Sequence, residues 1–518
     1  MKLITIFLSI AASSLAIKRS QPHLIILLVD DLGHHNTELT NEEAFTPAIT
    51  ELVSTSGRRL NRHYSYKYCS PSRSSLLSGR YPIHVNEINP SNVNSTGGVD
   101  LRMTMLPKKL KEANYTTAMV GKWHLGARQT SNLPTRRGFD YFFGFLGGGE
   151  DHDTQISYEA FNSVDLWGGE KGEGPSDRNG TNSCLLYGND ANEFIKNHDA
   201  DATPLFMFIS LQNCHSPYTS TEAFMDLNSN ITDYPQDKPS MDRRAMQAMM
   251  TCADEVTKNV TNTLHEKGMF DDTLMLWSSD NGGPSYWAAN NHPFRGTKGS
   301  GFEGGVRVIS FIAGGKNVLD ESLVGQDVDE KIMFADWYST FCSLAGVDDN
   351  DEGSGEVPNV DGIDLSELLL GKAGDGESKR RTILPIASDT LIVEDEETGV
   401  EWKIVRGNPQ YQNEGLGFWQ PECWPSAEHY FPNQEEPDVV CKSELGCLFN
   451  LSEDELELND LSDVEVEKLQ EMSDLLDQWV AGAWQTGDDG YQDPHYLNCT
   501  SLEKKIEETN GYAAPVCT

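Results

Sequence analysis

The sequence predicts an α/β protein, with a large domain built on a mainly parallel sheet flanked by helices and a smaller C-terminal α+β domain. Two observations support this prediction. In the first part of the chain, apolar runs of strand length alternate with helix-forming stretches, as they do in doubly wound sheets. After about residue 345 the composition changes to acidic, glycine-rich loops followed by short strand-like pieces. A chain of 518 residues is long enough for more than one such unit.

Four apolar runs are predicted to be strands, and polar residues follow each of them. The first run, Leu24 to Val29, is continuous rather than alternating, which is typical of a strand buried on both faces of a parallel sheet. The others are Thr116 to Val120, Leu205 to Leu211 and Thr273 to Trp277. Parallel sheets bind their ligands at the carboxyl ends of the strands. We therefore expect the polar residues after these runs to lie at one edge of the sheet.

Helices are predicted between these strands. Thr46 to Gly57 has Pro47 near its start and a glycine at its end, which is the usual order of helix signals. Met241 to Gly268 has helix-forming composition, and its final glycine suits a helix end. We place a targeting segment at 1–16, the large domain at 17–378, and the small domain with its tail at 379–518. Within the small domain, strands are expected at 382–386, 402–405 and 446–451, and an acidic amphipathic helix at about 464–481.

The net charge argues against two classes of partner. Forty Lys and Arg residues stand against 80 Asp and Glu residues, which gives a formal charge of −40. Such an acidic surface repels nucleic acid and anionic membrane, so we expect neither as a partner. It also repels an anionic substrate at long range, so either a local cluster of Lys, Arg and metal holds the substrate or the working pH is low enough to neutralise many carboxylates.

The first residues are predicted to be a secretory signal peptide. Lys2 precedes an apolar run from Leu3 to Ala12, and Ser14 and Ala16 supply the small residues of a cleavage site. No later run is long enough to span a bilayer. Ten cysteines suit an oxidising compartment. Glycosylation sequons begin at Asn94, Asn114, Asn179, Asn230, Asn259, Asn450 and Asn498. The expected location is the secretory pathway, with a secreted or lysosomal product.

The sharpest local pattern surrounds Cys69. It reads Cys69-Ser70-Pro71-Ser72-Arg73 and continues through a short helix-forming stretch to Ser78-Gly79-Arg80. This run resembles the sulfatase signature C-x-P-S-R, which is followed by T/S-G-R. The resemblance implies that a formylglycine-generating enzyme oxidises Cys69 to formylglycine, whose hydrated aldehyde is the nucleophile, and that Arg73 holds the diol. The other interpretation of the run is a disulfide cysteine in a turn. If Cys69 is set aside, nine cysteines remain, and at least one of those should be unpaired. Cys423, Cys441 and Cys447 lie close enough in sequence to form one bridge, and the sequence leaves open which two of them pair.

Two strand ends supply candidate metal ligands. Asp30 and Asp31 follow the first run, and Asp280 and Asn281 follow the fourth. Hard oxygen ligands of this kind suit Ca²⁺ or Mg²⁺ better than zinc. Either pair alone is more often a turn or a helix cap. In the sulfatase family the matching positions bind one divalent cation beside the modified cysteine, so the resemblance implies one Ca²⁺, or Mg²⁺, at Asp30, Asp31, Cys69, Asp280 and Asn281.

The resemblance also implies a set of residues that handle charge and protons. The segment Gly121-Lys122-Trp123-His124-Leu125-Gly126 matches the family's G-K-W-H-L-G, which would place Lys122 on the sulfate and His124 on the hydrated aldehyde. His215 stands where the family has a histidine that protonates the leaving oxygen. Lys298, in a segment resembling R-G-x-K...E-G-G-x-R, would be the second lysine on the sulfate.

The resemblance covers roughly residues 22–346, and more loosely 444–450. It implies an alkaline-phosphatase-like fold and a sulfuric ester hydrolase, most similar to the arylsulfatase B-type group. Members of that group remove 4-sulfate from N-acetylgalactosamine at glycosaminoglycan chain ends. The loops at about 147–181 and 286–292, which would shape the sugar subsites, contain no motif from which residue roles can be carried over. The reaction is therefore better determined than the substrate.

Two other functions fit parts of the sequence. A phosphoester hydrolase of the alkaline-phosphatase superfamily would usually carry Ser or Thr as nucleophile and two metals with several His ligands. The chain has Cys69 instead, and few histidines at its strand ends. A non-catalytic protein that binds sulfated glycans would be indicated by the loss of a site residue, but every position that can be matched is filled.

Overall fold

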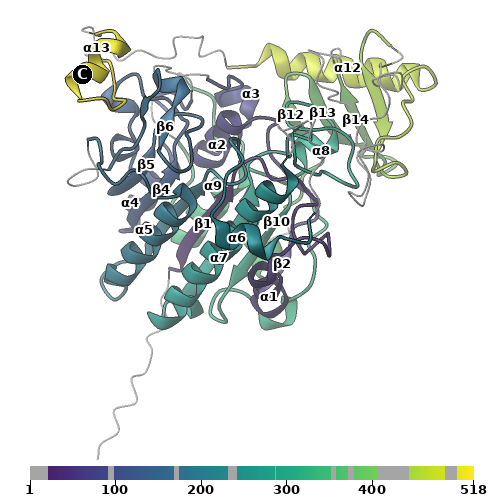
Figure 1. Cartoon of the computed structure of the whole chain (residues 1–518). Coiled ribbons are helices and arrows are strands. Elements are labelled where there is room, and N and C mark those ends of the chain that lie inside the picture. The colour runs from purple at the N-terminus through teal and green to yellow at the C-terminus, as the bar shows by residue number, and fades with distance from the viewer. Residues whose placement is uncertain are drawn as a thin grey trace, which may run out of the picture.

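The computed structural model describes residues 21–90, 98–168, 174–231, 242–285, 287–351, 357–371, 379–406, 441, 443–484 and 499–517 (Figure 1). The segment predicted to be a signal peptide lies outside the described residues. Among the described residues, none of the helices combines the length and the apolar character that crossing a membrane requires.

A seven-stranded sheet forms the centre of the large unit. Its strand order is β2-β10-β9-β1-β8-β4-β5. The strands are β1 (His23–Val29), β2 (Gly57–Arg59), β4 (Thr116–Lys122), β5 (Tyr141–Phe145), β8 (Leu205–Leu211), β9 (Thr273–Ser279) and β10 (Ser310–Gly314). The run from β9 to β5 is parallel, and β10 is antiparallel to both of its neighbours. The predicted mainly parallel sheet is confirmed, and the four predicted strands are found as β1, β4, β8 and β9.

Helices cover both faces of this sheet because β1 is apolar on both faces. Leu24, Ile26 and Leu28 pack on one side, in a core that includes residues of α2 and α9. Ile25, Leu27 and Val29 pack on the other, with residues of α1, α5 and α7. The bounds are α1 (Pro47–Ser56), α2 (Cys69–Ser78), α4 (Leu106–Glu112), α5 (Ser183–Asn197), α7 (Arg243–Glu266) and α9 (Asp336–Ala345). Helices α5 and α7 lie side by side (Figure 1) and are joined by the disulfide Cys184–Cys252.

The smaller unit is an antiparallel sheet with one covering helix. Its order is β12-β13-β14-β15, with β12 (Ile383–Ala387), β13 (Thr390–Glu394), β14 (Glu401–Val405) and β15 (Cys447–Asn450). Helix α12 (Val466–Ala481) packs on one face through Leu469, Met472 and Leu476. The opposite face contacts Tyr64 and Phe302 of the large unit. The predicted α+β character of this part of the chain is confirmed.

The C-terminal segment returns to the large unit. Helix α13 (Leu502–Glu508) lies beside the hairpin of β6 (Ile156–Ser157) and β7 (Ser163–Val164), away from α12 (Figure 1). The disulfide Cys499–Cys517 closes this segment. The remaining short elements are β3 (His63–Tyr64), β11 (Ile332–Met333), α3 (Pro82–Val85), α6 (Glu222–Leu227), α8 (Glu303–Val306) and α10 (Ser366–Leu370).

Cysteine pairing agrees with the expectation of unpaired thiols. A third bridge joins Cys441 to Cys447, which are two of the three C-terminal cysteines predicted to share a disulfide. The other candidate, Cys423, lies outside the described residues. Cys69, Cys214 and Cys342 are buried and reduced. The signature cysteine is therefore not a disulfide cysteine.

Candidate active site

The structure brings the predicted oxygen ligands together at one edge of the sheet. Strands β1 and β9 are parallel neighbours with Val29 opposite Ser279, so the residues that follow them are adjacent. Asp30, Asp280 and Asn281 are completely buried, and Asp31 is nearly so. The backbone N–H of Asp31 donates to Asp280 Oδ1 at 3.1 Å, which ties the two strand ends together.

Cys69 opens helix α2 and directs its thiol into this cluster. Its Sγ lies 3.4 Å from Asp30 Oδ1, 3.8 Å from Asp31 Oδ1 and 3.4 Å from Lys298 Nζ. Every residue of α2 is buried, so the helix is fixed on all sides. The thiol position is therefore set by the packing of a whole helix, not by a mobile loop.

Three cations surround the carboxylates. Lys122, at the end of β4, pairs with Asp30, and Lys298 Nζ lies 2.6 Å from Asp31 Oδ1. Arg73, one turn after Cys69, donates to Asp280 Oδ2 from Nη2 at 2.9 Å and from Nε at 3.1 Å. Three buried carboxylates thus face three cations, which limits the electrostatic penalty of burying them.

Burial and charge shift the pKa values inside the cluster. Burial and the carboxylate of Asp30 raise the pKa of the Cys69 thiol well above its usual range, although Lys122 and Lys298 oppose the rise. Burial and Asp30 also raise the pKa of Asp280 to about 6, against the guanidinium of Arg73. For Asp31, burial raises the pKa, but Lys298 and His215 more than compensate and hold it below the usual value.

Two histidines border the cluster. His215 Nε2 lies 3.7 Å from Asp31 Oδ2, and the His215 side chain is 15% exposed, so it faces the open side. His124 is buried, with Nε2 3.0 Å from the carbonyl oxygen of Pro90 and Nδ1 without a hydrogen-bond partner among the described residues. Burial lowers the pKa of both rings, that of His215 to about 3. Both rings are therefore neutral near neutral pH.

Left-handed backbone marks two of these positions. Asp31 has φ 57° and His124 has φ 52°, which is uncommon for residues other than glycine. Such conformations concentrate at functional sites, where the surrounding structure over-determines them. Both residues follow strands, and Asp31 turns its carboxylate towards Lys298 and Cys69.

The oxygen cluster fits a divalent cation. Ligand atoms of Asp30, Asp31, Asp280 and Cys69 all lie within 4.8 Å of one another, which is the span expected around an ion bound at about 2.3–2.6 Å. The side-chain oxygen of Asn281 is buried and has no hydrogen-bond partner in the described part of the chain, although its Nδ2 donates to Asp31 Oδ1 at 2.8 Å. A buried amide oxygen left unpaired is unusual and is a natural ligand for a hard cation.

Sequence reasoning missed two supporting residues. Ser210, in the interior of β8, accepts a hydrogen bond from Arg73 and donates to the carbonyl of Lys122 at 2.8 Å. His152 contacts the carbonyl of His215 at 3.0 Å through Nε2. A serine inside an otherwise apolar buried strand is a sequence signal that could have identified Ser210. His152 lies in a loop that matched no family motif, so no such signal existed for it.

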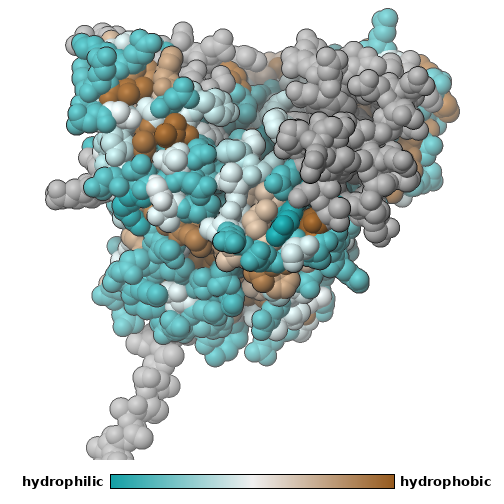
Figure 2. All heavy atoms as spheres, viewed as in Figure 1, coloured by the Kyte–Doolittle hydropathy of each residue, from teal (hydrophilic) through white to brown (hydrophobic). Residues whose placement is uncertain are grey.

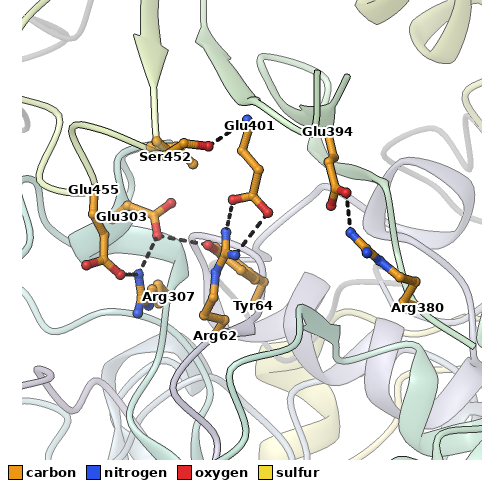
Figure 3. A pocket seen from close by; sticks show the side chains of 11 residues that line it. Arg62, Tyr64, Glu303, Arg307, Arg380, Glu394, Glu401, Ser452 and Glu455 are labelled. Carbon is orange, nitrogen blue, oxygen red and sulfur yellow. Dashed lines mark hydrogen bonds and ion pairs between the residues drawn. The ribbon is translucent and has the colours of Figure 1, made fainter. Parts of the chain in front are cut away.

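A pocket lies between the two units, away from this cluster, and Figure 3 shows its lining. It measures about 380 Å³ and its wall alternates arginines with glutamates. Arg62 pairs with Glu401, Arg380 pairs with Glu394, and Arg307 lies 2.5 Å from Glu455. Because these charges already neutralise one another, the pocket is an ion-paired contact between the units, and none of the predicted site residues lines it.

A parallel sheet that holds a buried cysteine, a cation-ligand cluster and two lysines at its carboxyl edge defines a hydrolase of anionic esters. The family model described as Sulfatase matches residues 22–347. The chain therefore belongs to the sulfatase family and is a sulfuric ester hydrolase.

Known proteins agree with this assignment. Arylsulfatase J of Mus musculus is 32% identical over 466 residues, which cover 86% of this chain and 73% of that protein. N-acetylgalactosamine-6-sulfatase of Mus musculus is 28% identical over 392 residues, covering 72% of this chain and 70% of that protein. The crystal structure of Ps i-CgsB in complex with k-i-k-neocarrahexaose superposes with a TM-score of 0.68 at 23% identity, covering 95% of this chain and 98% of that chain. This last likeness concerns the fold alone.

Proposed function

We propose that this sulfatase removes sulfate from sulfated sugars, with the 4-sulfate of N-acetylgalactosamine at glycosaminoglycan chain ends as the first candidate. The carrying observation is the position of Cys69, which is reduced, buried and within 3.4 Å of both Asp30 and Lys298. Two comparisons support a sugar substrate: a relative named N-acetylgalactosamine-6-sulfatase and a structure of similar fold solved with an oligosaccharide. The relative's name makes the 6-sulfate the second candidate.

Cys69 would be converted to formylglycine, whose hydrated aldehyde supplies the nucleophilic hydroxyl. Lys122 and Lys298 reach the cluster from different segments and would hold the sulfate oxygens, where negative charge develops. Arg73 has no exposed surface and is fixed by Asp280 and Ser210, so it would hold the hydrated side chain in one orientation.

The two histidines suit opposite proton-transfer roles. His124 Nε2 faces a carbonyl, which only a protonated nitrogen can satisfy, so Nδ1 carries the lone pair and would act as the base. His215 borders the open side and would protonate the leaving oxygen. Its low pKa means that the ring is neutral before substrate binds, so its acid role requires the negative charge of the sulfate to raise that pKa.

One divalent cation, Ca²⁺ with Mg²⁺ as the alternative, would be held by Asp30, Asp31, Asp280 and Asn281 beside the modified Cys69. When bound, it supplies positive charge for a sulfate oxygen. The ligands are oxygens on two rigid strand ends, which favours a hard cation over zinc.

The proposed route of the protein is the secretory pathway, towards secretion or the lysosome, with a formylglycine-generating enzyme as a partner during maturation. Support comes from the signal-peptide pattern and from three disulfides, which persist in oxidising compartments. Asn114, Asn179, Asn230 and Asn259 are exposed, as glycosylated asparagines must be.

Sulfate release from N-acetylgalactosamine 4-sulfate and 6-sulfate, measured against 4-nitrophenyl sulfate, tests the proposal. We expect turnover of a sulfated sugar by wild type, and none by Cys69→Ser. The mass of the tryptic peptide that contains Cys69 should show formylglycine. An active enzyme with an unmodified Cys69, or one that cleaves the aryl sulfate but no sulfated sugar, would contradict the proposal.

A further inference from the structure

A glycine loop separates the two histidines from a hairpin that the sulfatase motifs do not include. A Cβ placed on Gly148 would lie 2.8 Å from His124 Nε2 and 3.0 Å from Glu159 Oε1. A Cβ on Gly149 would lie 3.2 Å from the ring of His215. Both histidines therefore lie against this loop, and the carboxylate of Glu159 lies against the same glycine as His124.

Glu159 is held at this place by one of its two oxygens. Gly148 N–H donates to Glu159 Oε2 at 2.7 Å, while Oε1 makes no hydrogen bond within the described part of the chain. The side chain is half-buried. Burial raises the pKa of Glu159, and the ammonium groups of Lys122 and Lys298 oppose the rise, which places the carboxylate in the field of the cluster. A half-buried oxygen without a partner at the rim of a site is available to a ligand.

The preceding residue presents an exposed aromatic ring. Tyr158 is 71% exposed, and it begins the short turn Tyr158–Ala160 that also carries Glu159. Partial burial and Glu159 raise the pKa of its hydroxyl, and Lys122 and Lys298 oppose the rise. An exposed tyrosine at the mouth of a polar site is a stacking surface for a sugar ring.

The C-terminal segment fixes the hairpin that carries both residues. Ala513 N–H donates to the carbonyl of Val164 at 2.8 Å, and Val164 N–H donates to that of Gly511 at 3.2 Å. Ala160 packs against Ala513 and Val516 in a small apolar cluster. On the other side, the hydroxyl of Ser157 donates to the carbonyl of Gly149 at 2.7 Å. Figure 2 shows apolar surface over the region of β6 and the C-terminal segment. Because the C-terminal segment holds the hairpin on one side and the glycine loop holds it on the other, the hairpin is preorganised.

We infer that Tyr158 and Glu159 form the subsite for the sugar ring that carries the scissile sulfate, and this inference rests on the proposed function. Tyr158 stacks on the apolar face of the ring, and Glu159 Oε1 accepts a hydrogen bond from a ring hydroxyl or an acetamido N–H. Glu159 determines specificity, because an aryl sulfate without ring hydroxyls has no hydrogen bond to donate to it, whereas Tyr158 can stack on either ring.

The test compares kcat/KM for the better of the two N-acetylgalactosamine sulfates with kcat/KM for 4-nitrophenyl sulfate, within each variant. For Glu159→Gln, we expect the sugar-to-aryl ratio to fall at least about tenfold, since a charge-assisted hydrogen bond is weakened. Tyr158→Ala should lower kcat/KM for the sugar about three- to tenfold, while Tyr158→Phe, which keeps the ring, should stay within about twofold.

Glu193→Gln is the matched control, because it removes one negative charge from an exposed position on α5 and should leave the ratio unchanged. Misfolding of Glu159→Gln or of the control would lower both rates and cancel in the ratio. An unchanged ratio in Glu159→Gln, or equal losses in Tyr158→Ala and Tyr158→Phe, would overturn the subsite. If wild type cleaved only the aryl sulfate, the proposed function itself would fall, and the subsite with it.

Discussion

Replacing Lys403 with methionine should destabilise the contact between the small sheet and the catalytic unit. Lys403 Nζ lies 2.7 Å from Glu303 Oε1 on α8 and 2.7 Å from Glu457 Oε1 after β15. All three side chains have no exposed surface. The methionine would fill a similar volume but leave two carboxylates facing each other without the cation between them.

The loss of stability depends on the hydrogen-bond and ion-pair partners that each carboxylate retains in Lys403→Met. Glu303 retains the hydroxyl of Tyr64 at 3.0 Å and the guanidinium of Arg307 at 3.5 Å, whereas Glu457 retains the backbone N–H of Glu303 at 2.7 Å. Removing one partner of a buried ion pair typically costs about 3–5 kcal/mol. That is a large part of the total of about 5–15 kcal/mol by which proteins are stable.

The loss should depend on pH. Burial and the charge of Glu303 raise the pKa of Glu457 to about 7, against the opposing effect of Lys403. Without Lys403 this pKa rises further, so the folded state binds a proton that the unfolded state releases above about pH 4.3. The variant should therefore lose more stability at about pH 8 than at about pH 5.5, because stability falls as pH rises through the folded pKa.

Urea unfolding of wild type, Lys403→Met and Lys468→Met at both pH values would measure this. Lys468 belongs to the same unit but pairs with Asp395 and Glu471 at the surface, so its replacement should cost less than about 1 kcal/mol. If Lys403→Met costs no more than Lys468→Met, or if its cost does not change with pH, the reasoning about the buried charges is wrong.

Three further outcomes are expected. Asp280→Asn should lower the content of divalent cation, measured by elemental analysis, below about one ion per chain, because it removes an anionic oxygen ligand. A content of one ion per chain in this variant would contradict the assigned ligand set. Lys298→Ala should reduce kcat/KM for 4-nitrophenyl sulfate about a hundredfold or more in steady-state assays, since it removes charge near the developing anion; a loss below about fivefold would refute that role. Replacing Cys184 and Cys252 together by alanine should lower the free energy of unfolding by about 2–4 kcal/mol in denaturant titrations, because the bridge closes a sequence separation of 68 residues; an unchanged midpoint would count against it.

The sequence alone determined the class of fold and the core of the site. Continuous apolar runs define the buried parallel strands, and the polar residues that follow them must meet at one edge because parallel strands end on the same side. This is why Asp30 and Asp280, which are far apart along the chain, could be assigned to one cluster from the strand pattern. The signature at Cys69 is local, so it could be identified without tertiary contacts. The limits of the two domains and the roles of the individual site residues stay predictions.

Only the tertiary structure decided what surrounds that core. The hairpin with Tyr158 and Glu159 carries no pattern of its own, because its position depends on contacts with Gly148 and Gly149 and on the C-terminal segment that packs against it. The buried triad centred on Lys403 joins residues from three distant segments, and charged residues in a sequence give no sign of burial. The pattern that predicts a strand lies in neighbouring residues of the sequence. The contacts of the hairpin and of the Lys403 triad instead depend on long-range packing, which no local pattern encodes.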